Sequence, residues 1–162
     1  MKLKDLDNYL KNSFFIDPIN TRNAYNVNAN NNNNISLEET EDITIWYIKE
    51  SIDGVLCGYA FTFLQGSTVP SKNYLFGSIN ISSDFVSLMF KDNSGSNIET
   101  GTGKIQITKN NKIIFIMQTT NSIDNAGDKI GFVHSSYMIK YNNYTKVDNK
   151  IKELISICEN NI

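Results

Sequence analysis

The chain has 162 residues, of which 40% are hydrophobic and 20% charged, and this composition predicts one folded domain over residues 1–162. The formal net charge of −2 is too small for the basic surface of a nucleic-acid-binding protein, so we expect no nucleic-acid partner. No stretch approaches the roughly 18–20 apolar residues that cross a bilayer, so we expect no membrane contact.

The first segment predicts an amphipathic helix over residues 1–15. Apolar residues recur there at spacings of three and four, which place them on one helical face: Leu3, Leu6, Leu10 and Phe14. The pair Asp17-Pro18 stops this helix, because the residue before a proline avoids the helical conformation. Residues 16–42 are predicted as an Asn-rich and acidic connection, since runs such as Asn30–Asn34 have little to bury.

Residues 43–141 predict a β-meander. Apolar residues and turn signals divide this region into seven strands: 43–49, 55–63, 74–81, 85–90, 97–108, 113–120 and 130–141. Asp53-Gly54 is the clearest hairpin signal, because a type I′ turn needs positive φ angles. Strands joined in sequence by short turns favour an up-and-down antiparallel sheet, and curling into a small barrel or half-barrel removes exposed edges.

Two of the predicted strands contain small residues that indicate close packing or a change in the course of the strand. Gly58 and Ala60 alternate with large residues, so we expect another part of the protein to come close to their face. Gly101 and Gly103 lie two apart in one strand and would allow a bulge or a sharp bend there.

The end of the chain predicts a second amphipathic helix over residues 145–160. Its apolar stripe is Val147, Ile151, Leu154, Ile155 and Cys158, and we expect this helix to cover a mouth or a face of the sheet. The predicted fold is therefore mainly β, with α+β character only at the termini. Cys57 and Cys158 are expected to be two buried thiols, with a disulfide as the alternative if the helix packs on that strand.

Groups that carry chemistry are scarce in this chain. It has one histidine, one arginine and two cysteines, so we expect no catalytic residue, no metal and no cofactor. His134 lies in the middle of the last strand, and the stretch from Asp128 to Asp148 holds no carboxylate between its ends to orient it. We expect a half-buried histidine bonded to a neighbouring strand.

One segment concentrates negative charge and is the predicted partner-binding site. It consists of Glu38, Glu39, Glu41 and Asp42, immediately before the first strand of the meander. These carboxylates could meet a cationic protein such as a basic toxin domain, where charge mainly raises the association rate and the specificity. The alternative is a solubilising loop.

A second hypothesis places a small ligand inside the barrel. Polar side chains and tyrosines run through the strands and could line a pocket: Tyr59, Tyr74, Ser78, Gln118, His134, Ser136 and Tyr137. The alternative is that these residues form the solvated face of an antiparallel sheet.

The pair Trp46-Tyr47 in the first strand of the meander resembles the opening strand of lipocalin-like barrels. That strand carries Gly-x-Trp, whereas Thr44 stands two residues before Trp46 here. The closing-strand arginine of those barrels is also missing, since Arg22 is the sole arginine. The resemblance implies a barrel architecture alone.

These observations favour a non-catalytic binding protein. The first hypothesis is a small protein–protein inhibitor, such as an immunity protein that neutralises a toxin. The alternatives are a carrier or sensor of small molecules, and then a cofactor-free enzyme with its site in the barrel cavity. No apolar stretch typical of a secretory signal follows Met1–Asp5, so we expect a cytoplasmic location.

Overall fold

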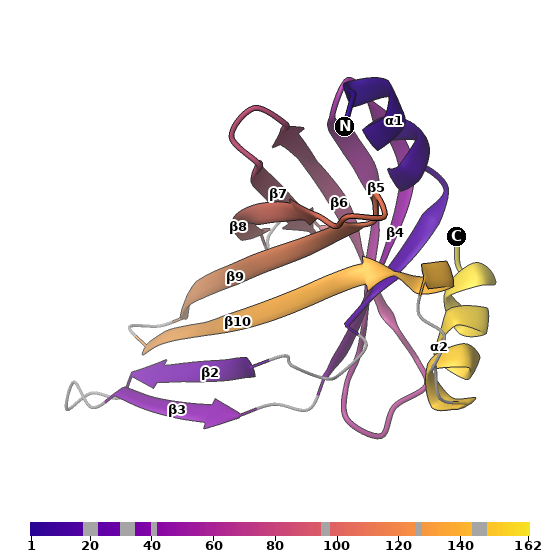
Figure 1. The fold of residues 1–162 in the computed structure, drawn as a ribbon. Helices are drawn as coiled ribbons and strands as arrows, with labels where there is room; N and C mark the ends of the chain where they lie inside the picture. The colour runs from indigo at the N-terminus through magenta and orange to yellow at the C-terminus, as the bar shows by residue number, and fades with distance from the viewer. Residues whose placement is uncertain (18–22, 30–34, 40–41, 95–97, 126–127, 144–148) are drawn as a thin grey trace.

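A computed structural model describes residues 1–17, 23–29, 35–39, 42–94, 98–125, 128–143 and 149–162. Side chains are described for these residues except 23–29, 35–39, 119–125, 128–136 and 143. The described part is mainly β, with one antiparallel sheet and a helix near each end (Figure 1). The elements are α1 Leu3–Leu10, β1 Ser13–Ile16, β2 Asn23–Ala29, β3 Ile35–Glu39, β4 Ile43–Ile52, β5 Val55–Phe63, β6 Ser71–Asn80, β7 Phe85–Lys91, β8 Ile98–Ile107, β9 Ile113–Asn125, β10 Asp128–Lys140, the 3₁₀ turn η1 Tyr141–Asn143 and α2 Asn149–Glu159.

Eight of the described strands close into an antiparallel barrel in the order β1-β4-β5-β6-β7-β8-β9-β10. The short strand β1 closes it, because Phe14 pairs with Tyr47 of β4 and Ile16 pairs with Ile139 of β10. The predicted antiparallel meander curled into a barrel is confirmed for β4–β10. The predicted number of seven strands and the half-barrel alternative are wrong, because β1 supplies an eighth strand.

The first helix is shorter than predicted. It ends at Leu10, and Phe14 lies in β1 instead of continuing the helical stripe. Asn12 has φ 55°, a left-handed conformation that asparagine tolerates better than most residues, and its Oδ1 accepts a hydrogen bond from the Tyr47 hydroxyl. The helical period of the apolar residues continues past this point, but the backbone turns at Asn12 and enters a strand.

Residues 16–42 are not simply a connection. Their described parts include the end of β1 and the hairpin of β2 and β3, whereas the run Asn30–Asn34 lies outside the described residues. β2 pairs with the first half of β10, from Asn28↔Ile130 to Asn23↔Ser135. The long strand β10 presents a backbone edge with which β2 pairs. Backbone hydrogen bonds form whatever the side chains are, so the polar composition of residues 16–42 did not exclude strands. β9 and β10 likewise extend into the segment between the predicted strands 113–120 and 130–141, to Asn125 and from Asp128.

The bulge that Gly101 and Gly103 would allow does not occur. The register of β8 with both neighbours continues through these two residues. The break lies on β4, between Ile48 and Glu50, opposite Gly58 and Cys57 of β5. A Cβ atom on Gly58 would come 1.9 Å from the Tyr47 carbonyl oxygen, so only glycine allows the two backbones to approach this closely.

The barrel interior is packed with apolar side chains around Trp46. The ring of Trp46 lies 5.8 Å from that of Phe90 and 5.7 Å from that of Phe115. Ala60 is the register partner of Trp46, so a small residue on β5 makes room for the indole. The buried interior cluster consists of Leu6, Leu10, Phe15, Trp46, Ile48, Leu56, Ala60, Leu75, Ile79, Val86, Leu88, Phe90, Ile105, Ile113, Phe115, Met117 and Met138.

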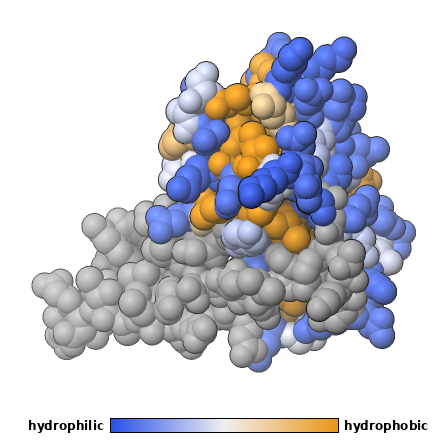
Figure 2. All heavy atoms as spheres, in the orientation of Figure 1, coloured by the Kyte–Doolittle hydropathy of each residue, from blue (hydrophilic) through white to orange (hydrophobic). Residues whose placement is uncertain are grey.

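Helix α1 belongs to this interior cluster and packs beside β4. Leu6 and Leu10 are fully buried, and Figure 2 shows apolar atoms gathered beside the helix, framed by hydrophilic side chains. The Lys140 ammonium group donates a 2.8 Å hydrogen bond to the Tyr9 carbonyl oxygen, one of the last carbonyls of the helix. Burial lowers the pKa of Lys140. The helix is thus fixed both by its apolar face and by polar contacts.

Asp7 of α1 holds the β4–β5 hairpin. Asp53 and Gly54 form its two-residue turn with φ of 51° and 77°, which confirms the predicted turn. The Asp7 carboxylate accepts hydrogen bonds from both turn amides, at 2.8 and 3.0 Å, and from the Ser51 hydroxyl at 2.6 Å. One carboxylate therefore satisfies three donors, including that of buried Ser51.

Replacing Asp7 by alanine should lower the free energy of unfolding by about 2 kcal/mol, because the buried Ser51 donor and two amides lose their acceptor. Urea denaturation followed by Trp46 fluorescence measures this change. Exposed Asn8 on the same helix is the matched control, and Asn8→Ala should change the stability by less than about 0.5 kcal/mol. Equal effects of the two substitutions would contradict this role of Asp7.

Helix α2 covers the outer side of the barrel wall. Its residues Leu154, Ile155 and Cys158 pack against Ile45 and Phe61, together with Ile16, Tyr47 and Phe63. The helical prediction is confirmed over Asn149–Glu159, and residues 145–148 lie outside the described part. Neither of the described helices has the length and the apolar character that a bilayer crossing requires.

Both cysteines are free thiols, so the disulfide alternative does not occur in this structure. Cys158 lies on α2 and is fully buried against the barrel wall, whereas Cys57 on β5 is half-buried. Burial is the main cause that raises the pKa of Cys158 from 9.0 to about 12, with the charge of Glu159 adding to it. The Cys158 thiol therefore stays protonated and unreactive at neutral pH.

In a Cys57→Ser variant, the remaining thiol should resist alkylation by iodoacetamide at pH 8 and react fully in urea, as mass spectrometry would show.

The free energy of unfolding of this variant should also fall as the pH rises from 9 towards 12, because the Cys158 thiol loses its proton at a lower pH in the unfolded state. A Cys57→Ser/Cys158→Ala variant should lack this contribution. Rapid alkylation of Cys158 in the folded protein would contradict its burial.

Candidate functional site

The residues predicted to line an interior pocket lie on the outer wall wherever their side chains are described. On β6, Leu75 and Ile79 are buried in the interior, so the alternating residues Tyr74 and Ser78 face outward. The same alternation places Tyr59, Gln118 and Tyr137 outside. The side chains of His134 and Ser136 lie outside the described part. The structure thus brings Tyr59 and Tyr74 together, but on the outer wall and not around an interior ligand.

The acidic segment is spread over two elements. Glu38 and Glu39 lie on β3, the last strand in the order of the described sheet, and their side chains are not described. Glu41 lies outside the described residues, and Asp42 is half-buried immediately before β4. A charged strand at the end of a sheet also discourages pairing with other chains, so this charge has a structural explanation as well. Its role in partner binding stays a prediction.

An apolar surface that we name the outer patch covers part of β5, β6 and β7. It consists of Cys57, Tyr59, Tyr74, Phe76 and Met89. These residues are neighbours in the sheet, because Phe76 is the register partner of both Cys57 and Met89, and Tyr74 is that of Tyr59. The exposed fractions of Tyr74, Phe76 and Met89 are 42%, 44% and 43%. Large apolar side chains this exposed and this close together are typical of interaction surfaces.

The aromatic rings of the outer patch continue a row of rings that starts at buried Tyr47 on β4. The rings of Tyr47 and Tyr59 stack with centroids 6.5 Å apart, and Tyr59 is 6.0 Å from Tyr74. Tyr74 is in turn 6.1 Å from Phe76. The Lys72 ammonium group lies 4.0 Å from the centroid of Tyr59 and donates to the Asn161 carbonyl oxygen at 2.6 Å. Ring contacts and this bridge to the residues after α2 hold the patch in place.

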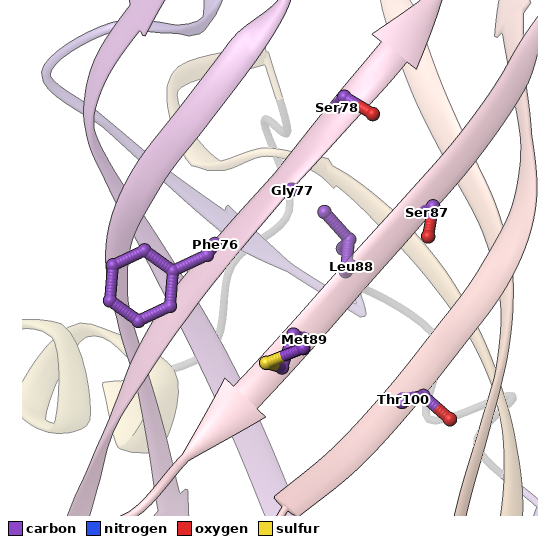
Figure 3. A pocket seen from close by; sticks show the side chains of 7 residues that line it. All are labelled: Phe76, Gly77, Ser78, Ser87, Leu88, Met89 and Thr100. Carbon is purple, nitrogen blue, oxygen red and sulfur yellow. The ribbon is translucent and has the colours of Figure 1, made fainter.

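A shallow depression of about 290 Å³ adjoins the outer patch on β6, β7 and β8. Its lining residues are Phe76, Gly77, Ser78, Ser87, Leu88, Met89 and Thr100. In Figure 3, Phe76 and Met89 lie towards one end of the depression and Ser78 and Ser87 towards the other, with Thr100 on the third strand. A depression with apolar residues at one end and hydroxyl groups around it can accept an apolar side chain of a ligand. The hydroxyl groups can hydrogen-bond polar groups of the same ligand.

The register of the strands explains the depression. Phe76 pairs with Met89, and two residues away Ser78 pairs with Ser87, so large and small outward residues stand in adjacent rows. Gly77 lies between them and faces the interior, where a Cβ atom would come 2.3 Å from the Ser87 carbonyl oxygen. The strands can therefore approach closely at Gly77, and the small residues beside it leave the wall hollowed.

Cations surround this part of the wall. Lys72, Lys91 and Lys104 occupy outward positions of β6, β7 and β8, and Lys91 and Lys104 are exposed. No aspartate or glutamate occupies an outward position of these three strands, since half-buried Glu99 alternates with the outward residues. Neither Lys91 nor Lys104 forms an ion pair with any residue in the part of the chain that the structure describes.

Comparison with protein-family models, with curated proteins and with solved structures found no match. Among the described residues, no group of three or more histidine, cysteine, aspartate or glutamate side chains is placed to hold a metal ion.

The packed interior predicts that the purified protein carries no small molecule inside the barrel. Native mass spectrometry should give the mass of the polypeptide alone, because the ring of Trp46 and its neighbours already fill the described interior. Phe115→Ala is the comparison variant, since removing the ring leaves a cavity that can admit a small apolar molecule such as benzene. A stoichiometric ligand in the wild-type protein would instead favour the carrier hypothesis.

Proposed function

We propose that this protein is a non-catalytic binding protein that recognises another protein through the outer patch and the adjoining depression. The observation that carries the proposal is the exposure of Tyr74, Phe76 and Met89 as neighbours on a wall whose other side consists of buried apolar residues. Tyrosine, phenylalanine and methionine are enriched at protein interfaces, and hot spots cluster in well-packed pockets. A rigid wall also loses little conformational entropy on binding.

An inhibitor such as an immunity protein is one form that this function can take. A small barrel that covers a surface of a second protein needs no reactive group of its own. We place the proposed contact on the outer wall instead of the acidic segment, because the exposure and the register of the wall residues support a contact there. The carrier alternative receives less support, since the predicted ligand residues with described side chains face outward.

Affinity capture tests the proposal with wild-type protein and a Phe76→Ser/Met89→Ser variant, each immobilised and exposed to an extract of the source cells. We expect a protein that is captured stoichiometrically by the wild type and at least about tenfold less by the variant, because hot-spot truncations cost more than about 1 kcal/mol each. Quantitative mass spectrometry of the bound fractions measures this. Circular dichroism would show that both proteins are folded.

Two further variants make the result specific. Val69→Ser removes an equally apolar and more exposed residue, 77% accessible, outside the outer patch, and should capture the same protein as the wild type. Glu38→Lys/Glu39→Lys tests the acidic segment. If this variant loses the captured protein while Phe76→Ser/Met89→Ser keeps it, the contact lies on the acidic segment and the proposed surface is wrong.

A further inference from the structure

We propose that the outer patch binds an acidic peptide segment of the partner, with one apolar side chain of that segment seated in the depression. This inference rests on the proposed protein-binding function and adds the chemistry of the partner. The acidic segment favoured a basic partner, whereas this inference assigns an acidic one.

Charge complementarity is the first argument. Lys91 lies two residues from Met89 on the same face of β7, which places its stem roughly 7 Å from that of Met89. Lys104 lies on the outer face of β8, the strand that also contributes Thr100. The carboxylates nearest to the patch in register are exposed Glu50, which is opposite Cys57, and half-buried Glu99, which is opposite the inward-facing Phe90. An acidic segment over β6–β8 therefore meets two ammonium groups and no carboxylate at an outward position of these strands.

The size and lining of the depression are the second argument. Its volume of about 290 Å³ lies at the lower limit of ligand pockets, which hold a drug-sized molecule only at roughly 300–1,000 Å³. It suits one apolar side chain packed beside Phe76 and Met89. The hydroxyl groups of Ser78, Ser87 and Thr100 surround it and can hydrogen-bond the main chain of an extended peptide.

The test selects short random peptides on the wild-type protein and on a Lys91→Glu/Lys104→Glu variant. The control variant Lys150→Glu/Lys152→Glu carries the same change of charge on the exposed face of α2, away from the patch. Wild type and control should both enrich peptides with aspartate or glutamate around one large apolar residue. The Lys91→Glu/Lys104→Glu variant should bind such a peptide about tenfold more weakly than the control does, as fluorescence anisotropy would measure.

Three outcomes would overturn the inference. Peptides that need Phe76 and Met89 but show no charge preference, or a basic one, contradict the acidic assignment and leave the protein-binding function standing. If no selected peptide depends on Phe76 and Met89, both the inference and the proposed surface fail. If vesicles of phosphatidylcholine with about a fifth phosphatidylserine bind the wild type but not Lys91→Glu/Lys104→Glu, while no acidic peptide does, the occupant is an anionic lipid surface.

Discussion

The structure depends on the packing of apolar side chains around Trp46 in the barrel interior. In a closed antiparallel barrel every second residue faces inward, and here the described inward residues fill the interior from α1 to the walls. Trp46 lies against Phe90 and Phe115 and opposite the small residue Ala60. Because the described interior is filled by apolar side chains, we place the proposed recognition on the outer wall.

Helix α2 covers one part of the outer wall and leaves another part exposed. α2 packs over Phe61 and Phe63 and buries them, and the aromatic row continues from there through Tyr59 and Tyr74 to exposed Phe76. The exposed part is therefore continuous with a surface that the protein covers with its own helix. Lysines border both parts, since Lys72 is the register partner of Phe61 on the covered part and Lys91 is that of Tyr74 on the exposed part.

Much of the barrel could be predicted from the sequence, because β4–β10 follow alternation and turn signals such as Asp53-Gly54. Two features could not. Phe14 continues the helical spacing of Leu10, and only the left-handed conformation of Asn12 shows that a strand starts there. The hairpin of β2 and β3 pairs through its backbone with β10, which is far away in the sequence, so the composition of this segment gives no sign of it.

The candidate site was harder to predict than the fold. β6 and β7 are apolar on both faces, as Leu75 beside Phe76 and Leu88 beside Met89 illustrate, so alternation alone does not tell which residue faces inward. The position of α2 and the closing strand β1 decide between the faces, and neither follows from local sequence.

The most direct test of the account places a photo-crosslinking amino acid at position 76 in the protein inside its own cells. The account predicts a discrete crosslinked protein from this position, and none from position 69, which is also exposed but lies outside the outer patch. A crosslink from position 38 of the acidic segment together with none from position 76 would contradict it.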